Sequence, residues 1–215
     1  MSAARPALVP QPTHVAHRPG RFTLDAGTRL RLSPGSEAAA RLLRATVGLP
    51  FVPSPDGAFV VALDPQLAGL GEEGYGLTVA PDAVLLRAAA PTGLLRGVQT
   101  VRQLLAPGGL TGRPAAPLLL PCVEITDVPR HRWRGFMLDV ARHFQPVSLL
   151  RRYVELLALH KINVLQLHLT DDQGWRLPVP GYPRLTEVGG RRAESMVGPA
   201  GSTVFDGVPH EGAYT

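Results

Sequence analysis

The sequence has little of several residue types, and each scarcity excludes a class of protein. Cys122 is the single cysteine, so no disulfide can form within the chain and the redox compartment stays open. Lys161 is the single lysine among 22 basic residues, and this arginine bias, with abundant Ala, Gly and Pro, indicates a GC-rich bacterial genome. The formal charge is +5, but the arginines are scattered and not interleaved with aromatics, so we expect no nucleic-acid partner.

Long apolar runs are also missing. No stretch approaches the roughly 20 apolar residues that a membrane-spanning helix needs, so we expect no membrane association. Residues 1–20 are rich in proline and contain no apolar run of signal-peptide length. This favours a flexible amino-terminal segment and a cytoplasmic location, unless a signal precedes residue 1. The 45% of hydrophobic residues is sufficient for a folded core.

Residues 21–126 show the pattern of a small α+β domain. Period-two alternation and short apolar runs predict strands at 29–32, 59–63, 75–80 and 83–89, the last two flanking a tight turn at Pro81-Asp82. Helices are expected over 37–47, with Ser36 as the N-cap, and over 93–105, with Thr92 as the N-cap. A proline-rich stretch at 114–121 joins this domain to the second half.

Residues 127–215 begin with the pattern of a βαβ unit. The nearly continuous apolar run at 133–141 predicts a strand buried on both faces, and 162–169 predicts another. Between them, apolar residues at helical spacing follow Pro146 and continue to about His160. Residues 171–215 contain eight Gly and five Pro and no long periodic segment. A βαβ unit is the building block of parallel sheets and barrels, and since one such unit cannot bury both faces of its strands, we expect a truncated domain.

Polar residues follow both predicted strands of this unit. Arg142 and His143 come after the first strand, and Asp171 and Asp172 come after the second. The carboxyl ends of parallel strands meet at one edge, where active sites form. An arginine and an acid there can together hold a polyhydroxylated ligand, because one donates to hydroxyl oxygens and the other accepts from hydroxyl groups. A purely structural ion pair between Arg142 and one of the acids is the open alternative.

Other polar residues allow functional and structural interpretations. His168 is out of phase with Asp171 along the strand, which predicts opposite sides and a packed core histidine. Asp139, within the first strand, is expected to make a structural hydrogen bond or ion pair. Trp175 either shapes a pocket rim or is buried beneath the loop. A metal site could be imagined from the four side chains His143, His168, Asp171 and Asp172, but they lack a closely spaced ligand motif.

Four stretches of the sequence resemble glycoside hydrolase family 20 β-N-acetylhexosaminidases. RGFMLDVARHF at 134–144 resembles the first barrel strand of that family, and HKINVLQLHLTDDQGWR at 160–176 resembles its second strand and loop. EGYGLTV at 73–79 and GVQTVRQLL at 97–105 resemble its accessory domain. The resemblance implies an α/β protein with a small α+β accessory domain at 21–126, followed over 127–215 by the first strands of a truncated (β/α)8 TIM barrel.

The resemblance also implies an activity. Such enzymes hydrolyse terminal β-linked N-acetylglucosamine or N-acetylgalactosamine with retention, using the substrate's own acetamide as the nucleophile, without metal or cofactor. By this resemblance, Arg142 binds sugar hydroxyls, and Asp171 belongs to a network that supports the acid/base Glu through a later histidine. Asp172, His143 and Trp175 are further candidates. The family's catalytic Asp-Glu pair matches no position among residues 1–215, so we expect no catalysis by these residues alone. A non-catalytic carbohydrate-binding or pseudoenzyme remnant is the alternative function, and an unrelated barrel enzyme such as a metal hydrolase is a third. The sequence leaves the oligomeric state open.

Overall fold

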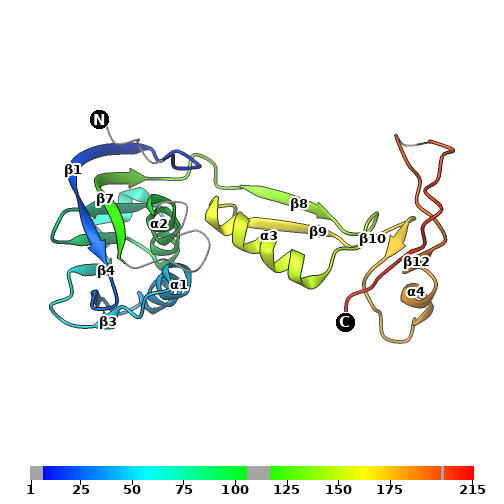
Figure 1. Cartoon of the computed structure of the whole chain (residues 1–215), viewed down its shortest axis with the longest axis horizontal. Coiled ribbons are helices and arrows are strands. Elements are labelled where there is room, and N and C mark those ends of the chain that lie inside the picture. The colour runs from blue at the N-terminus through cyan, green and yellow to red at the C-terminus, as the bar shows by residue number, and fades with distance from the viewer. Residues whose placement is uncertain (1–6, 106–116, 200) are drawn as a thin grey trace. The chain divides into compact units, whose positions relative to one another are not determined.

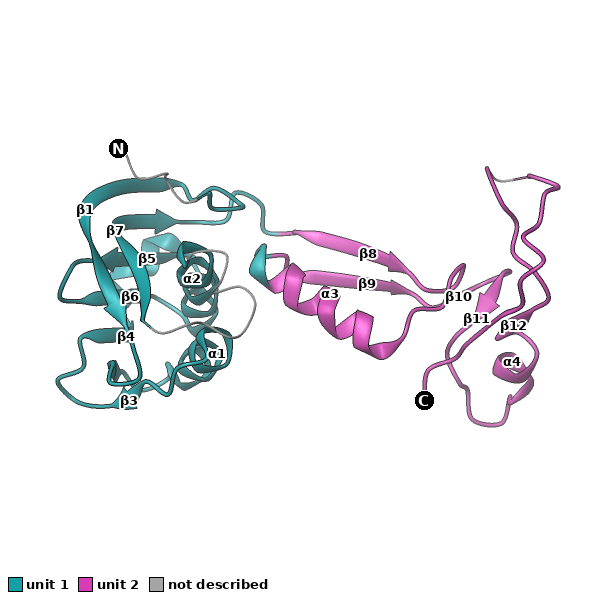
Figure 2. Ribbon diagram, in the orientation of Figure 1, with its two compact units in different colours: residues 1–132, 159–161 teal, residues 133–158, 162–215 magenta. Residues whose placement is uncertain are grey.

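The computed structural model describes residues 7–105, 117–199 and 201–215, which form two compact units (Figure 2). Unit 1 extends to Arg132 and also includes residues 159–161. Unit 2 comprises residues 133–158 and 162–215. The chain therefore first passes from one unit to the other at 132/133, whereas the sequence pattern placed the domain boundary at 126/127. In the described residues, no helix is long and apolar enough to cross a membrane.

Unit 1 is a seven-stranded mixed sheet with two helices (Figure 1). The strands are β1 (His14–Leu24), β2 (Arg29–Leu32), β3 (Val52–Pro53), β4 (Phe59–Leu63), β5 (Tyr75–Val79), β6 (Val84–Ala88) and β7 (Leu118–Asp127), in the order β1-β7-β5-β6-β4-β2-β3. Helices α1 (Glu37–Val47) and α2 (Pro91–Leu104) pack beside each other, and a 3-10 helix, η1 (Pro65–Leu70), follows β4. Apolar side chains of the sheet and of both helices form one core.

The predicted strands β2 and β4, helix α1 and the β5–β6 hairpin are confirmed. Of the two predicted N-caps, Ser36 holds that position and Thr92 does not. Helix α2 begins at Pro91 with Ala90 as its N-cap, so Thr92 already lies inside the helix. Proline suits the first helical position because the backbone N–H that it lacks would have no partner there. Ser36 is the N-cap residue of α1, but its hydroxyl donates to Ser33 O (2.6 Å) and makes no capping hydrogen bond to the helix.

The strand pair β1–β7 contains two segments that the sequence pattern assigned otherwise. Residues 14–20, assigned to a flexible segment, lie in β1, and residues 118–121 of the proline-rich joining stretch lie in β7. Of the remainder of that stretch, 114–116 lie outside the described residues, and Pro117 precedes the strand. The pairing register shifts between His17 and Arg21, around Gly20 with its positive φ of 103°. This irregularity accommodates the prolines but interrupts the alternation by which a strand is recognised.

Unit 2 begins with the predicted βαβ unit. Strands β8 (Gly135–Asp139) and β9 (Val164–His168) are parallel, and helix α3 (Val147–Leu159) connects them. The register pairs Asp139 with His168 at the carboxyl end. The remaining elements are short, namely β10 (Thr170–Asp171), β11 (Gly174–Trp175), α4 (Arg184–Glu187), β12 (Arg191–Arg192) and β13 (His210–Glu211).

The prediction that the first strand of this unit is buried on both faces is wrong for the described chain. Phe136 is 38% exposed and Met137 51% exposed. Within the described residues β8 pairs only with β9, so neither a second neighbouring strand nor a full helical layer covers these side chains. The apolar pattern therefore indicates a degree of burial that these residues do not provide by themselves.

Candidate functional site

The carboxyl edge of the β8–β9 pair gathers the polar residues that the sequence singled out. Arg142 Nη1 lies 2.7 Å from Asp139 Oδ2, and Arg142 Nη2 lies 2.8 Å from Asp171 Oδ2. Asp139 ends β8, and Asp171 follows the end of β9, in the short strand β10. The expected proximity of Arg142 and Asp171 is therefore observed, as is the ion pair expected for Asp139. The Arg142 side chain is 48% exposed, so part of it faces solvent.

His168 joins this cluster, contrary to the expectation from strand alternation. Its Nε2 lies 2.6 Å from Asp171 Oδ2, and its side chain is 30% exposed. Alternation holds only within one continuous strand, and β9 ends at His168, one residue before β10 begins. Across this break at Leu169 the side chains of His168 and Asp171 meet. His168 is therefore a member of the polar edge and not a packed core residue.

Both carboxylates of the cluster are held in their ionised form. The hydrogen bonds from His168 and from the Asp172 backbone N–H lower the pKa of Asp171 to about 2, and the nearby charge of Arg142 acts in the same direction. Burial by itself would raise the pKa of Asp139, but hydrogen bonds from the backbone and guanidinium of Arg142 outweigh it and the pKa is lowered. The same contact with Asp139 raises the pKa of Arg142. The edge is a charged donor–acceptor array at neutral pH.

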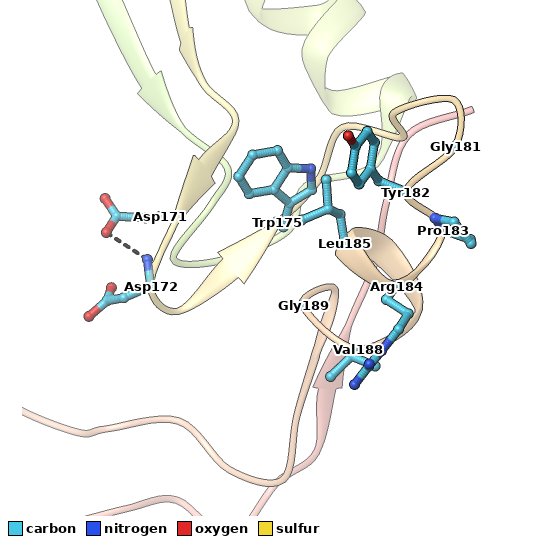
Figure 3. Close-up of a pocket in the computed structure, with 10 residues that line it drawn as sticks. All are labelled: Asp171, Asp172, Trp175, Gly181, Tyr182, Pro183, Arg184, Leu185, Val188 and Gly189. Carbon is cyan, nitrogen blue, oxygen red and sulfur yellow. Dashed lines mark hydrogen bonds between the residues drawn. The ribbon is translucent and has the colours of Figure 1, made fainter.

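A pocket of about 620 Å³ adjoins Asp171 (Figure 3). Its lining residues are Asp171, Asp172, Trp175, Gly181, Tyr182, Pro183, Arg184, Leu185, Val188 and Gly189. Trp175 is thus a pocket-lining residue, with its indole N–H donating to Leu177 O (2.6 Å). Alternation along a continuous strand would point Asp172 away from Asp171, yet both line this pocket. The reason is that β10 ends at Asp171, so Asp172 already belongs to the turn that leads to β11.

His143 packs against a second histidine. Its ring stacks on that of His210 at a centroid distance of 4.2 Å, and His210 Nε2 accepts a hydrogen bond from the Phe144 N–H (2.9 Å). Burial lowers the pKa of His210, as do the charges of His143 and two arginines. Over residues 7–105, 117–199 and 201–215, no three His, Cys, Asp or Glu side chains converge as a metal site would require.

Two buried cations had no assigned role in the sequence interpretation. Lys161 Nζ lies 2.7 Å from Asp127 Oδ2 and donates to Tyr75 Oη (2.9 Å), within unit 1. Arg176 is 1% exposed and donates to four backbone carbonyls of unit 2. The available signal was that Lys161 is the single lysine and that Arg176 stands in a glycine-rich loop, but neither pattern specifies its partners.

With this geometry, the chain matches two parts of one family. The model for the glycosyl hydrolase family 20 catalytic domain matches residues 131–215, and that for domain 2 of glycosyl hydrolase family 20 matches residues 5–128. The chain is 46% identical over 152 residues to a beta-hexosaminidase of Akkermansia muciniphila, covering 71% of this chain and 28% of that protein. It is 34% identical over 219 residues to a beta-hexosaminidase of Vibrio furnissii, covering 99% of this chain and 34% of that protein.

Solved structures show the same relationship. An exo beta-N-acetylglucosaminidase of this family from Vibrio harveyi, in complex with N-acetylglucosamine, superimposes with a TM-score of 0.79 at 30% identity, covering 97% of this chain and 32% of that one. Streptomyces plicatus N-acetyl-beta-hexosaminidase gives a TM-score of 0.77 at 33% identity, covering 97% and 41%. The chain thus spans about a third of the length of its relatives. Unit 1 has the fold of their accessory domain and β8–α3–β9 belongs to a partial barrel. Since one family model alone matches more than half of it, this chain belongs to glycosyl hydrolase family 20.

Proposed function

We propose that these residues supply the sugar-binding edge of a β-N-acetylhexosaminidase, an enzyme that removes a terminal β-linked N-acetylglucosamine or N-acetylgalactosamine from a glycan. The observation that carries the proposal is the position of Arg142. Its guanidinium is anchored by Asp139 and Asp171 at the carboxyl edge and stays 48% exposed. A fixed guanidinium presents planar, charged donors to two adjacent sugar hydroxyls, which is the task that the family resemblance assigns to it.

In the proposed reaction the substrate supplies its own nucleophile. The carbonyl oxygen of the 2-acetamido group attacks the anomeric carbon while an acid Glu protonates the departing glycosidic oxygen, and water then opens the cyclic intermediate with net retention. Asp171 acts indirectly, because its carboxylate holds Arg142 and contacts His168. By the family resemblance, the Glu and the acetamide-orienting Asp have no counterpart among residues 1–215. We therefore assign sugar binding to this chain and propose that hydrolysis needs that additional pair.

Titration of the 215-residue chain with N-acetylglucosamine, followed by NMR or calorimetry, tests this assignment. Arg142→Ala should weaken binding about tenfold or more, because a charge-assisted hydrogen bond is lost. Arg152→Ala is the matched control, since Arg152 forms an exposed ion pair with Glu155 on α3. Equal affinities of the three proteins would contradict the role of Arg142, and no binding by the wild-type chain would contradict the sugar site.

A second measurement tests the division between binding and catalysis. The same chain should release no p-nitrophenol from p-nitrophenyl N-acetyl-β-glucosaminide. Turnover that persists after rigorous removal of host enzyme would contradict the requirement for the Asp-Glu pair. In a longer form that carries this pair, hydrolysis supports the enzyme, whereas sugar binding without hydrolysis favours a carbohydrate-binding protein.

A further inference from the structure

Arg176 is a fully buried cation whose guanidinium donates to backbone oxygens of four residues. Its Nε donates to Val140 O (3.1 Å) and its Nη2 to Ala141 O (2.8 Å). Its Nη1 donates to both Gly190 O and Gly212 O (2.9 Å each). Burial, followed by the charge of Arg192, lowers the pKa of Arg176, but a guanidinium remains protonated at neutral pH. The residue thus ties the end of β8 to two later loop segments.

The carbonyls of Val140 and Ala141 belong to the two peptide groups that lead directly into Arg142. The N–H groups of the same two peptides, those of Ala141 and Arg142, donate to Asp139 Oδ1 at 3.0 Å each. Each peptide group is therefore bonded at both ends, to Arg176 through its oxygen and to Asp139 through its nitrogen. The two hydrogen bonds of each peptide group restrict the rotation of the peptide plane. They therefore fix the position of the Arg142 backbone from which the side chain extends.

Close packing around Arg176 indicates a site shaped for a guanidinium. A Cβ added to Gly174 would lie 2.4 Å from Arg176 Nη2 and 2.5 Å from Ala141 O. Phe144 covers the group from one side, with its ring centroid 5.9 Å from Arg176 Cζ. The planar fork can serve Val140 and Ala141 together, whereas the single ammonium of lysine cannot reproduce two parallel donors at fixed separation.

We propose that Arg176 and Asp139 form a peptide clamp that positions Arg142 for the sugar hydroxyls. Both are positioning residues, since Arg176 reaches the ligand only through the backbone and Asp139 also holds Arg142 Nη1. The clamp explains how a half-exposed arginine keeps a defined direction without being buried. Its relevance to sugar binding rests on the function proposed above, whereas its effect on Arg142 does not.

The test compares wild-type chain, Arg176→Lys and, as the matched control, Arg191→Lys, whose arginine forms an exposed ion pair with Glu211. Amide hydrogen exchange of Arg142 is the main readout, since its backbone N–H donates to Asp139. In Arg176→Lys this exchange should accelerate about tenfold and N-acetylglucosamine affinity should fall by a similar factor, while Arg191→Lys matches wild type. Unchanged exchange and affinity in a folded Arg176→Lys protein would overturn the proposal.

A second pair of variants examines the other half of the clamp. In Asp139→Asn the side-chain amide still offers one oxygen to both N–H groups, so this variant should retain slow exchange at Arg142, and Asp139→Ala should lose it. Equal exchange in these two variants would contradict the clamp. If Arg176→Lys does not fold, the wild-type chain tests the clamp through NMR couplings across the hydrogen bonds from the Arg176 guanidinium to the Val140 and Ala141 carbonyl carbons. Absence of these couplings would overturn the proposal. Failure of sugar binding with an intact clamp would count against the proposed function alone.

Discussion

Asp171 joins two polar side chains at the carboxyl edge, because Arg142 and His168 both contact its Oδ2. Strand positions in the sequence predicted that Arg142 would meet one of the two acids, since consecutive parallel strands end at one edge. They did not predict the contact with His168, which forms across the one-residue break between β9 and β10. An ion pair between Arg142 and one of the two acids was therefore predictable from the sequence, but the choice of Asp171 and the membership of the cluster were not.

The lowered pKa of Asp171 has a consequence for acid stability. A carboxyl group with an ordinary pKa of about 3.9 in the unfolded chain and about 2 in the fold stabilises the fold above pH 4, and this contribution is lost as the pH falls from about 4 through 2. Asp171→Asn should therefore be less stable than wild type at about pH 5 to 7, with the two curves converging toward about pH 2. Thermal melts across this range, with NMR titration of the carboxyl carbon, measure both effects.

Asp172→Asn is the comparison for this experiment. Asp172 lines the same pocket, but through its backbone N–H it donates to Asp171 Oδ1 (2.8 Å), a bond that the substitution retains. Its pH–stability curve should therefore follow wild type more closely than that of Asp171→Asn. In an active longer form, Asp171→Asn should also reduce kcat more than Asp172→Asn does. The reverse order in either measurement would show that Asp172 is the residue that organises the edge.

The sequence of helix α2 reflects close packing against the sheet as well as helix propensity. Gly97 lies in the middle of α2, where glycine is about 1 kcal/mol less favourable than alanine. A Cβ at Gly97 would lie 2.2 Å from Leu86 Cδ1 and 3.1 Å from Tyr75 Cδ2. Glycine is needed here because the helix approaches the sheet so closely.

Gly97→Ala should therefore destabilise the protein by about 1–3 kcal/mol, the usual effect of overpacking a core, despite its better helix propensity. Urea unfolding followed by circular dichroism gives the difference. Gly69→Ala is the control, because a Cβ there meets nothing within 4 Å, and it should stay within about 0.5 kcal/mol of wild type. A stabilised Gly97→Ala protein would mean that α2 can move away from β6 without cost.

The stability of unit 1 also depends on a residue from far along the chain. Lys161 is 3% exposed and has a positive φ of 59°. With residues 159 and 160 it belongs to unit 1, although the segments on either side, 133–158 and 162–215, belong to unit 2. Its ammonium satisfies Asp127 and Tyr75, and Tyr75 Oη also lies 2.6 Å from Thr100 Oγ1. Burial, followed by the charge of Asp127, raises the pKa of Tyr75 far above its usual value, so the phenol stays protonated.

Lys161→Met should lower the free energy of unfolding by about 3–5 kcal/mol, because Asp127 would be left as a buried charge without its ammonium partner. Chemical denaturation of the 215-residue chain measures the loss. The double variant Lys161→Met with Asp127→Asn should recover part of it, since the buried charge is then removed. A loss below about 1 kcal/mol in Lys161→Met would show that water or another group compensates for the ammonium.

The two units should differ in their resistance to proteolysis. Unit 1 contains one continuous apolar core, whereas Trp133 is 72% exposed and strand β8 presents Phe136 and Met137 to solvent. Limited proteolysis should therefore cleave first within unit 2 and leave a resistant product that contains residues 20–126. Mass spectrometry of the early products identifies the sites. A protected core spanning 133–170 would contradict this order.

Sequence alone determined the types of β2, β4, β5, β6, α1 and α2, the βαβ order and the meeting of Arg142 with one of the acids after β9, because periodicity and parallel-strand geometry are local rules. Tertiary structure alone decided the pairing of β1 with β7, the burial of Lys161, the contact of His168 with Asp171, and the contact of Arg176 with the peptides before Arg142. Each of these depends on where a bulge, a strand or a loop ends in space. No short-range pattern encodes that position, because it results from close packing between segments far apart in the sequence.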